Sequence, residues 1–414
     1  MAVRVVTRRA LKGTLILLLA QFPVLVRAPA LAQTTTLHDA VQAAWDRLPD
    51  RAGVEARRQA ATARVNAAGA LLPDAPYAVG TYVNDKAGSN QYYVTHQAEI
   101  GTPVWLPGQG RATQDAARAE ITSLSAEAEA AHLAVALQVL DAATQASISA
   151  NTRDAARRRL QASQALAANL NRRFRIGEAA QSDALAADAD AASAMVTLAD
   201  AQAQFAGAQA LLASLTGQPA VPSLMGPEPP LPKMDAVRDT HPRLIAARRV
   251  AEAAQSAMRL TRIESRNSPE VGIQGLNEKQ GAASAWNTRF GLVVRFPFAT
   301  EARNAPRLAA AQSQVTNAQV QLVQAERQVT SELQQSVATL AGARQGSAAA
   351  TRAASSLATR RGQIERAWRA GEMPLIEVVR ANALAFDAEL ARDKARTGLL
   401  AAQQRVRIAQ GVVP

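Results

Sequence analysis

The sequence contains the same pattern twice, and this duplication constrains the fold more than any other feature. A helix-rich stretch with one short strand pair runs over residues 37–217 and returns over residues 234–413. Three landmarks recur in the same order at nearly constant separation: Leu48-Pro49-Asp50 with His241-Pro242-Arg243, Gly101-Thr102-Pro103-Val104 with Arg295-Phe296-Pro297-Phe298, and Arg175-Ile176-Gly177-Glu178 with Arg369-Ala370-Gly371-Glu372. A duplicated unit predicts pseudo-symmetry, which is typical of rings, solenoids and channels.

Residues 1–32 have the pattern of a secretory signal peptide. A positively charged region ends at Lys12, residues 15–26 are apolar, and Ala30-Leu31-Ala32 offers a cleavage site before Gln33. A membrane anchor is the alternative, but the apolar run is short and Pro23 interrupts it. The pair Arg8-Arg9 also allows twin-arginine export. The signal predicts an exported protein.

Composition excludes several functions. The absence of cysteine excludes disulfides, thiolate metal sites and thiol catalysis. The four histidines lie far apart in the sequence, without metal-ligand spacing, and no nucleophile motif joins a serine or an aspartate to any of them. Without the signal's five positive residues, the formal charge of +12 falls to about +7, and the charges are interspersed. We therefore expect no enzyme, no cofactor, no metal site and no nucleic-acid partner.

Beyond the signal, the sequence suggests no run long and apolar enough for a transmembrane helix. Contact with a membrane would then require strands, a surface helix or a partner. Strands are predicted at about residues 76–104 and 270–298, where apolar and polar residues alternate with period two around a turn-rich loop. In the first hairpin one face has Tyr92, Val94, His96, Ala98 and Ile100, and the other Tyr93, Thr95, Gln97 and Glu99. In the second hairpin, Trp286, Phe290, Leu292, Val294 and Phe296 alternate with Asn287, Arg289 and Arg295.

The rest of each repeat is predicted to be a hairpin of very long helices. Residues 111–176 contain no Gly or Pro, and residues 307–372 contain no Pro. Such helices would reach on the order of 100 Å. Glycine turns at Gly177 and Gly371 end them, and a second helix returns to about Leu215 and Ile408. The domains are then residues 33–217 and 236–414, with a Pro-rich linker at 218–235.

A lone hairpin is barely stable in water, and four strands cannot close a useful barrel. Several chains that pool their strands can close one, and closure removes the exposed edges. An apolar aromatic face opposite a polar face is the pattern of a membrane barrel with lipid outside and water inside.

At this point the chain resembles the outer-membrane efflux protein family, the TolC-like channels, over essentially its whole mature length. The tandem architecture carries the resemblance, together with residues 37–44, residues 241–247, Pro103 and Pro297, Phe174-Arg175-Ile176-Gly177-Glu178 and Trp368-Arg369-Ala370-Gly371-Glu372. The resemblance implies a mainly α fold with a small β part. It implies a homotrimer in the outer membrane, with a twelve-stranded barrel that continues into a periplasmic α-helical barrel. It further implies a passive exit duct of a tripartite efflux or type I secretion system, served by a periplasmic adaptor and an inner-membrane transporter.

The resemblance also implies functional residues. Acidic residues at the periplasmic entrance match Asp183 and Glu377, but a further acidic position is occupied here by Arg380. The adaptor would dock at Gly177, Glu178, Gly371 and Glu372. The aromatic residues expected at the membrane interface are Tyr77, Tyr92, Trp286 and Phe296. The segment Gly108-Gln109-Gly110-Arg111 after Pro107 is similar to the branch that serves metal-cation efflux.

Plainer alternatives exist for these residues and for the function. Asp183 and Glu377 could lie on a solvated helix face, and the glycines could simply terminate helices. The chain could also be a periplasmic adaptor or a coiled-coil scaffold without a pore. The duplicated unit and the matched apolar strand faces argue against both.

Overall fold

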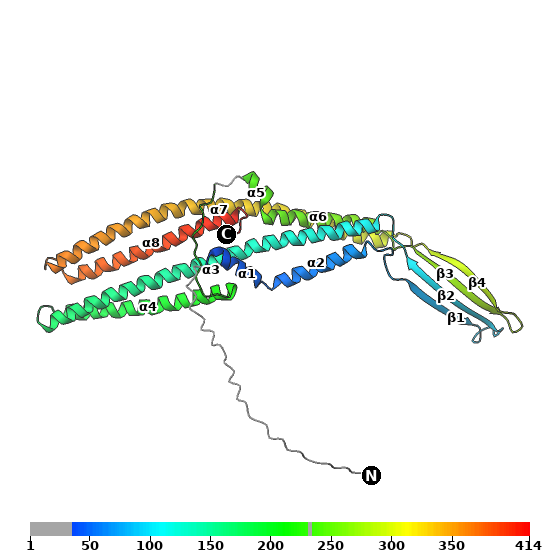
Figure 1. Ribbon diagram of the computed structural model, residues 1–414, viewed down its shortest axis with the longest axis horizontal. Helices are drawn as coiled ribbons and strands as arrows, with labels where there is room; N and C mark the ends of the chain where they lie inside the picture. The colour runs from blue at the N-terminus through cyan, green and yellow to red at the C-terminus, as the bar shows by residue number, and fades with distance from the viewer. Residues whose placement is uncertain (1–34, 231–233) are drawn as a thin grey trace, which may run out of the picture. The chain divides into compact units, whose positions relative to one another are not determined.

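The computed structural model describes residues 35–230 and 234–414 (Figure 1). The predicted signal peptide and linker residues 231–233 lie outside this range. The described chain is mainly helical with one small antiparallel sheet, as the sequence predicts. The elements are α1 (Leu37–Asp46), α2 (Asp50–Ala67), β1 (Tyr77–Asn84), β2 (Tyr93–Pro103), α3 (Gln109–Arg175), α4 (Gln181–Thr216), α5 (Met234–Thr240), α6 (Pro242–Ile263), β3 (Glu270–Gln280), β4 (Asn287–Arg295), α7 (Glu301–Arg369) and α8 (Leu375–Ala409).

The two longest helices are equivalent members of the two repeats. Helix α3 has 67 residues and α7 has 69, so each is about 100 Å long. Each pairs with its shorter successor, α4 or α8, in a helical hairpin (Figure 1). Toward the strands, α2 packs on α3, and α6 packs on both α3 and α7. The two repeats are joined where α3 contacts α6 and α8.

Small side chains allow the helices to pack closely. In the largest core cluster, Ala136, Ala143 and Ala146 are fully buried, and Leu140 and Leu212 pack with them. The short helix α1 begins with a capping box, in which the Thr36 hydroxyl and the Asp39 carboxylate satisfy each other's backbone N–H groups. Ile408 of α8 joins the same cluster, so the core draws on both repeats.

Helix α2 ends at Ala67, and beyond it the carbonyl of Ala70 accepts a hydrogen bond from Trp105. Two expectations about the long helices need correction. Helix α7 begins at Glu301 rather than after Pro306, and Pro306, its sixth residue, removes one intrahelical hydrogen bond in the second turn. Helix α3 does contain a stretch long and apolar enough to cross a membrane by composition. Half of that stretch is buried inside the chain, because α3 packs against α1, α4, α6 and α8.

The four strands form one sheet in the order β1-β2-β3-β4. Strands β1 and β2 form the first predicted hairpin, and β3 and β4 form the second. The sequence did not predict how the hairpins combine. Strand β2 pairs with β3 in an antiparallel register from Tyr93↔Gln280 to Pro103↔Glu270, which makes one sheet from the two repeats.

Candidate functional site

One face of the sheet is apolar and exposed. The register puts Ile100 opposite Ile273, and Ile273 opposite Leu292, so these three side chains share a face. Their exposed fractions are 59%, 65% and 70%, and that of Phe290 on the same face is 88%. Exposed apolar surface is unfavourable in water, by about 25 cal/mol for each Å². A continuous face of this kind marks an interaction surface.

The opposite face of the sheet is polar and internally paired. The Tyr77 hydroxyl on β1 lies 3.1 Å from Glu99 Oε1 on β2 and 2.9 Å from Glu270 Oε2 on β3. Gly101 permits this reach, because a Cβ there would lie 2.6 Å from the Tyr77 ring. Arg295 on β4 pairs with Glu270 at 2.6 Å, so the contacts run across all four strands. This face can therefore line an aqueous space.

The predicted interface aromatic residues fall in different places. Trp286 and Phe296 flank β4 and are half exposed at 50% and 52%. Tyr92 is 60% exposed but precedes β2, and its positive φ of 63° removes it from the predicted strand alternation. Tyr77, which is also expected at the interface, lies on the polar side of the sheet with the two glutamates.

Tyr82 is a further aromatic residue of the apolar face that the sequence pattern does not single out. Its ring is tilted against His96 at 5.1 Å, and His96 is tilted against Trp286 at 5.5 Å. These three rings form a band near the loop end of the apolar face. Phe296 and Phe298 mark the other end, where Arg266 lies 5.2 Å from the Phe296 ring. The period-two alternation places Tyr82 opposite His96 once the strand register is known.

The two helical hairpins end in matching glycine turns. Gly177 and Gly371 have φ of +80° and +82°, in the left-handed region that glycine tolerates best. The N–H of Glu178 donates to the Arg173 carbonyl at 2.8 Å, and that of Glu372 to the Ala367 carbonyl at 2.9 Å. These are the six-to-one hydrogen bonds of Schellman caps. Both glutamate side chains are exposed at the turns.

The three predicted entrance residues lie in the first turns after these caps. Asp183 is the third residue of α4, and Glu377 is the third residue of α8. Both are partly exposed. Arg380 pairs with Glu377 of its own chain at 2.7 Å, one helical turn away. The structure thus brings Arg380 and Glu377 together, and the pair carries little net charge.

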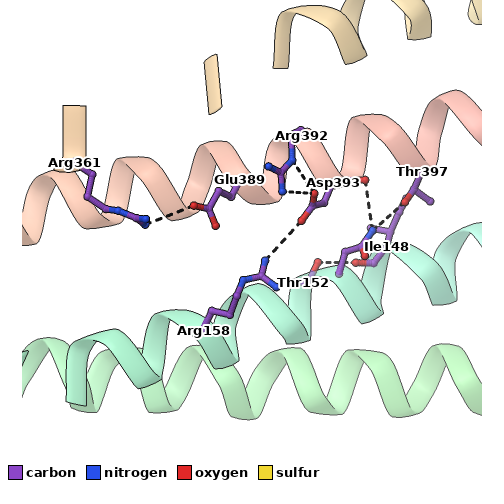
Figure 2. Close-up of polar contacts among 9 residues, drawn as sticks. Ile148, Thr152, Arg158, Arg361, Glu389, Arg392, Asp393 and Thr397 are labelled. Atoms are coloured by element: carbon purple, nitrogen blue, oxygen red, sulfur yellow. Dashed lines mark hydrogen bonds and ion pairs between the residues drawn. The ribbon is translucent and has the colours of Figure 1, made fainter. Parts of the chain in front are cut away.

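A polar seam joins the two repeats in the half of the helices that leads to these turns (Figure 2). Asn151 on α3 donates a hydrogen bond to the Thr397 hydroxyl on α8 at 2.9 Å. Arg158 on α3 approaches Asp393 on α8 at 3.7 Å, and Arg392 holds the same carboxylate at 2.8 Å. Within the second repeat, Arg361 of α7 continues this row of polar contacts by reaching Glu389 of α8 at 3.5 Å. Hydrogen bonds and ion pairs therefore contribute to the contact between α3 and α8 in this half of the helices.

The histidines have structural environments. His241 is 1% exposed, caps α6 by accepting the Arg243 N–H at its Nδ1, and burial lowers its pKa to about 4. His132 stacks on Trp45 at 4.8 Å, and burial lowers its pKa as well. In residues 35–230 and 234–414 no three potential ligands gather as a metal site. Gln109 of the Gly-Gln-Gly segment accepts the Leu106 N–H and donates to Glu264, which explains it as a strand-to-helix turn.

The chain is similar to known outer membrane channels. The model of the Outer membrane efflux protein family matches residues 40–218, the first repeat. The outer membrane protein VceC of Vibrio cholerae has a similar structure, with a TM-score of 0.69 at 19% identity over 91% of this chain and 96% of that one. So has the CmeC outer membrane channel of Campylobacter jejuni, with a TM-score of 0.71 at 14% identity over 91% and 85%. For the open state of the Neisseria gonorrhoeae MtrE outer membrane channel, the TM-score is 0.70 at 18% identity over 91% and 89%.

At these identities the structural likenesses show the fold, and the family match covers the first repeat. A search of curated sequences gave no match. The family consists of transport channels rather than enzymes, and its members generally work in tripartite efflux systems. The first repeat, residues 40–218, thus matches the outer membrane efflux protein family, and the described chain has the fold of outer membrane channels.

Proposed function

We propose that three copies of this chain form one passive exit duct, with a twelve-stranded barrel in the outer membrane and a helical tunnel in the periplasm. The observation that carries this proposal is the four-stranded sheet. Among the described residues, no further strand pairs with the outer edges of β1 and β4, and the apolar face of the sheet is exposed. Pairing β4 of one copy with β1 of the next removes the edges, and lipid covers the apolar face.

The dimensions of the sheet support a membrane span. The strands have 8 to 11 residues, which is about the length that a tilted transmembrane strand needs. Trp286 and Phe296 lie ten residues apart at the two ends of β4. At about 3.3 Å per residue and a tilt of about 40°, this corresponds to roughly 25 Å across the membrane, the height of the apolar band in such barrels.

The tips at Gly177 with Glu178, and at Gly371 with Glu372, dock a periplasmic adaptor, and an inner-membrane transporter supplies the substrate. Asp183 and Glu377 line the entrance. Because Arg380 neutralises Glu377, we expect only weak cation selectivity there. The relation to metal-cation efflux remains a hypothesis, since the segment that suggested it also has a structural role.

Conductance across a planar lipid bilayer tests the proposal. The purified full chain should give discrete, long-lived channels. The substitution Arg380→Gln frees Glu377 and should shift the reversal potential in a KCl gradient toward cation selectivity. The control is Arg369→Gln, which should have little effect because Arg369 lies 4.0 Å from Glu365 and, within the described residues, pairs with no other carboxylate. An absence of channels would contradict the duct. Unchanged selectivity in Arg380→Gln would contradict the entrance assignment alone.

A further inference from the structure

The two tips are equivalent in backbone but differ in the apolar surface that they expose. At the first tip Phe174 and Ile176 flank the Gly177 turn with exposed fractions of 40% and 66%. Leu185, in the second turn of α4, is 61% exposed. At the second tip, Trp368 corresponds to Phe174, Ala370 to Ile176 and Val379 to Leu185.

The side chains of Trp368 and Val379 are less exposed to a partner than those of Phe174 and Leu185. Both are partly buried against the cluster that contains Leu170 of α3 and Leu375 of α8. Trp368 also packs against Ile364 and Val378. The Arg173 guanidinium from the first repeat lies 5.6 Å from the Trp368 ring centroid. The second tip therefore uses its aromatic residue to hold the repeats together, and its one exposed large apolar side chain is Ile376, at 58%.

Basic residues surround the apolar residues of the first tip. Arg172 and Arg175 are exposed in the last turn of α3, and within the described ranges no ion pair is recorded for either. At the second tip, Arg369, the counterpart of Arg175, lies 4.0 Å from Glu365, whereas Arg366, the counterpart of Arg172, is exposed and has no ion pair within the described residues. A partner for the first tip should thus carry an apolar residue flanked by carboxylates.

We propose that the adaptor binds the two tips unequally, and that Phe174 and Ile176 of the first repeat form the dominant contact. The occupant is the turn of an adaptor helical hairpin, with an apolar side chain at its apex and acidic residues beside it. The second tip contributes mainly backbone and polar contacts around Gly371. This inference rests on the proposed function, because it assumes that the tips face an adaptor.

Site-specific photo-crosslinking in cells that produce the native adaptor tests the inference with the full chain. The probe is p-benzoylphenylalanine at position 176 or at position 370. We expect the crosslink from 176 to dominate, and its peptide to map to the turn of a helical hairpin in a periplasmic protein. Burying one isoleucine side chain corresponds to a change in affinity of about tenfold or more. Ile176→Asp should therefore abolish crosslinking from a neighbouring probe at Arg175, whereas Ala370→Asp should leave it within about twofold.

Exchanging the residues at positions 176 and 370 separates a change in adaptor binding from a loss of folding, because an unfolded variant would give no crosslink at either tip. The double variant Ile176→Ala with Ala370→Ile should move the dominant crosslink to the second tip. Equal crosslinking from both tips, a dominant signal from 370 in the unexchanged chain, or a crosslink from 176 only to another copy of this chain would overturn the inference. Bilayer conductance of the same samples tests the proposed function separately. Channels with equal crosslinks contradict the inequality of the tips, whereas an absence of channels contradicts the duct.

Discussion

Asn151 of α3 donates its side-chain N–H to the Thr397 hydroxyl of α8 at 2.9 Å, and this contact joins the two repeats. Thr397 is only 8% exposed, so water cannot easily replace the bond. The same amide approaches the Asp393 carbonyl at 3.5 Å. One side chain thus ties the helical hairpin of the first repeat to that of the second.

Replacing Asn151→Ala should lower the free energy of unfolding by about 1–3 kcal/mol, because Thr397 loses a buried partner. Thr152→Ala is the matched control. Its hydroxyl bonds the Ile148 carbonyl of its own helix at 2.8 Å, so we expect a change within about 0.5 kcal/mol. Thermal unfolding followed by circular dichroism in mild detergent measures both. Equal losses in the two variants would contradict a special role for the contact between repeats.

Substitutions at two adjacent residues of β4 test which face of the sheet contacts lipid. Leu292 lies on the exposed apolar face, and Val293 lies on the polar face opposite Gly272. Leu292→Lys should destabilise the barrel by about 2–4 kcal/mol and reduce the fraction assembled in the outer membrane. Val293→Lys should assemble normally and change the conductance. The reverse result would mean that the faces are assigned the wrong way round.

Replacing glycine by alanine should lower the stability of the protein at a glycine turn and raise it within a helix. Gly177 has φ of +80°, so Gly177→Ala should lower stability by about 1–2 kcal/mol through backbone strain. Gly346 lies within α7, with nothing within 4 Å of an added Cβ. Gly346→Ala should raise stability by about 0.5–1 kcal/mol. Melting temperatures of the two variants check the signs, and a stabilising Gly177→Ala would rule out the cap geometry described here.

His241 predicts a pH dependence of stability. Burial lowers its pKa to about 4, against a usual value near 6.5 in the unfolded chain. The unfolded state therefore binds the proton more readily between these values. Stability from this residue is complete above pH 6.5 and is lost as the pH falls toward 4, by roughly 2–3 kcal/mol.

The matched variant is His241→Asn, which retains a capping side chain without a titrating ring. Free energies of unfolding should be compared between pH 7 and pH 5. We expect the wild type to lose more stability than the variant over this interval. Parallel losses would show that other groups cause the acid sensitivity.

Much of this fold follows from local sequence patterns. The absence of Gly and Pro from residues 111–176 predicts α3, and the two glycine turns predict where the long helices end. Period-two alternation predicts both hairpins and their apolar faces. These features are local, so propensity and patterning determine them.

Nonlocal features could not be predicted in the same way. The pairing of β2 with β3 joins segments of different repeats, and no local pattern specifies such a partner. The resemblance places Tyr77 among the aromatic residues of the membrane interface. Its face depends on the contact with Gly101 and Glu270, which only the assembled sheet creates. Likewise, the Arg380–Glu377 pair depends on rotamers that sequence spacing permits but does not require.

The mass of the particle extracted from the outer membrane in mild detergent tests the central claim most directly. The full chain has a mass of 43.6 kDa, and the measured protein mass should equal three mature copies. Subunit stoichiometry by native mass spectrometry resolves this without reference to shape. A trimer from the outer membrane is the result we predict, because only shared strands remove the edges of β1 and β4. A monomer, or a protein recovered from the soluble periplasm, would contradict the duct.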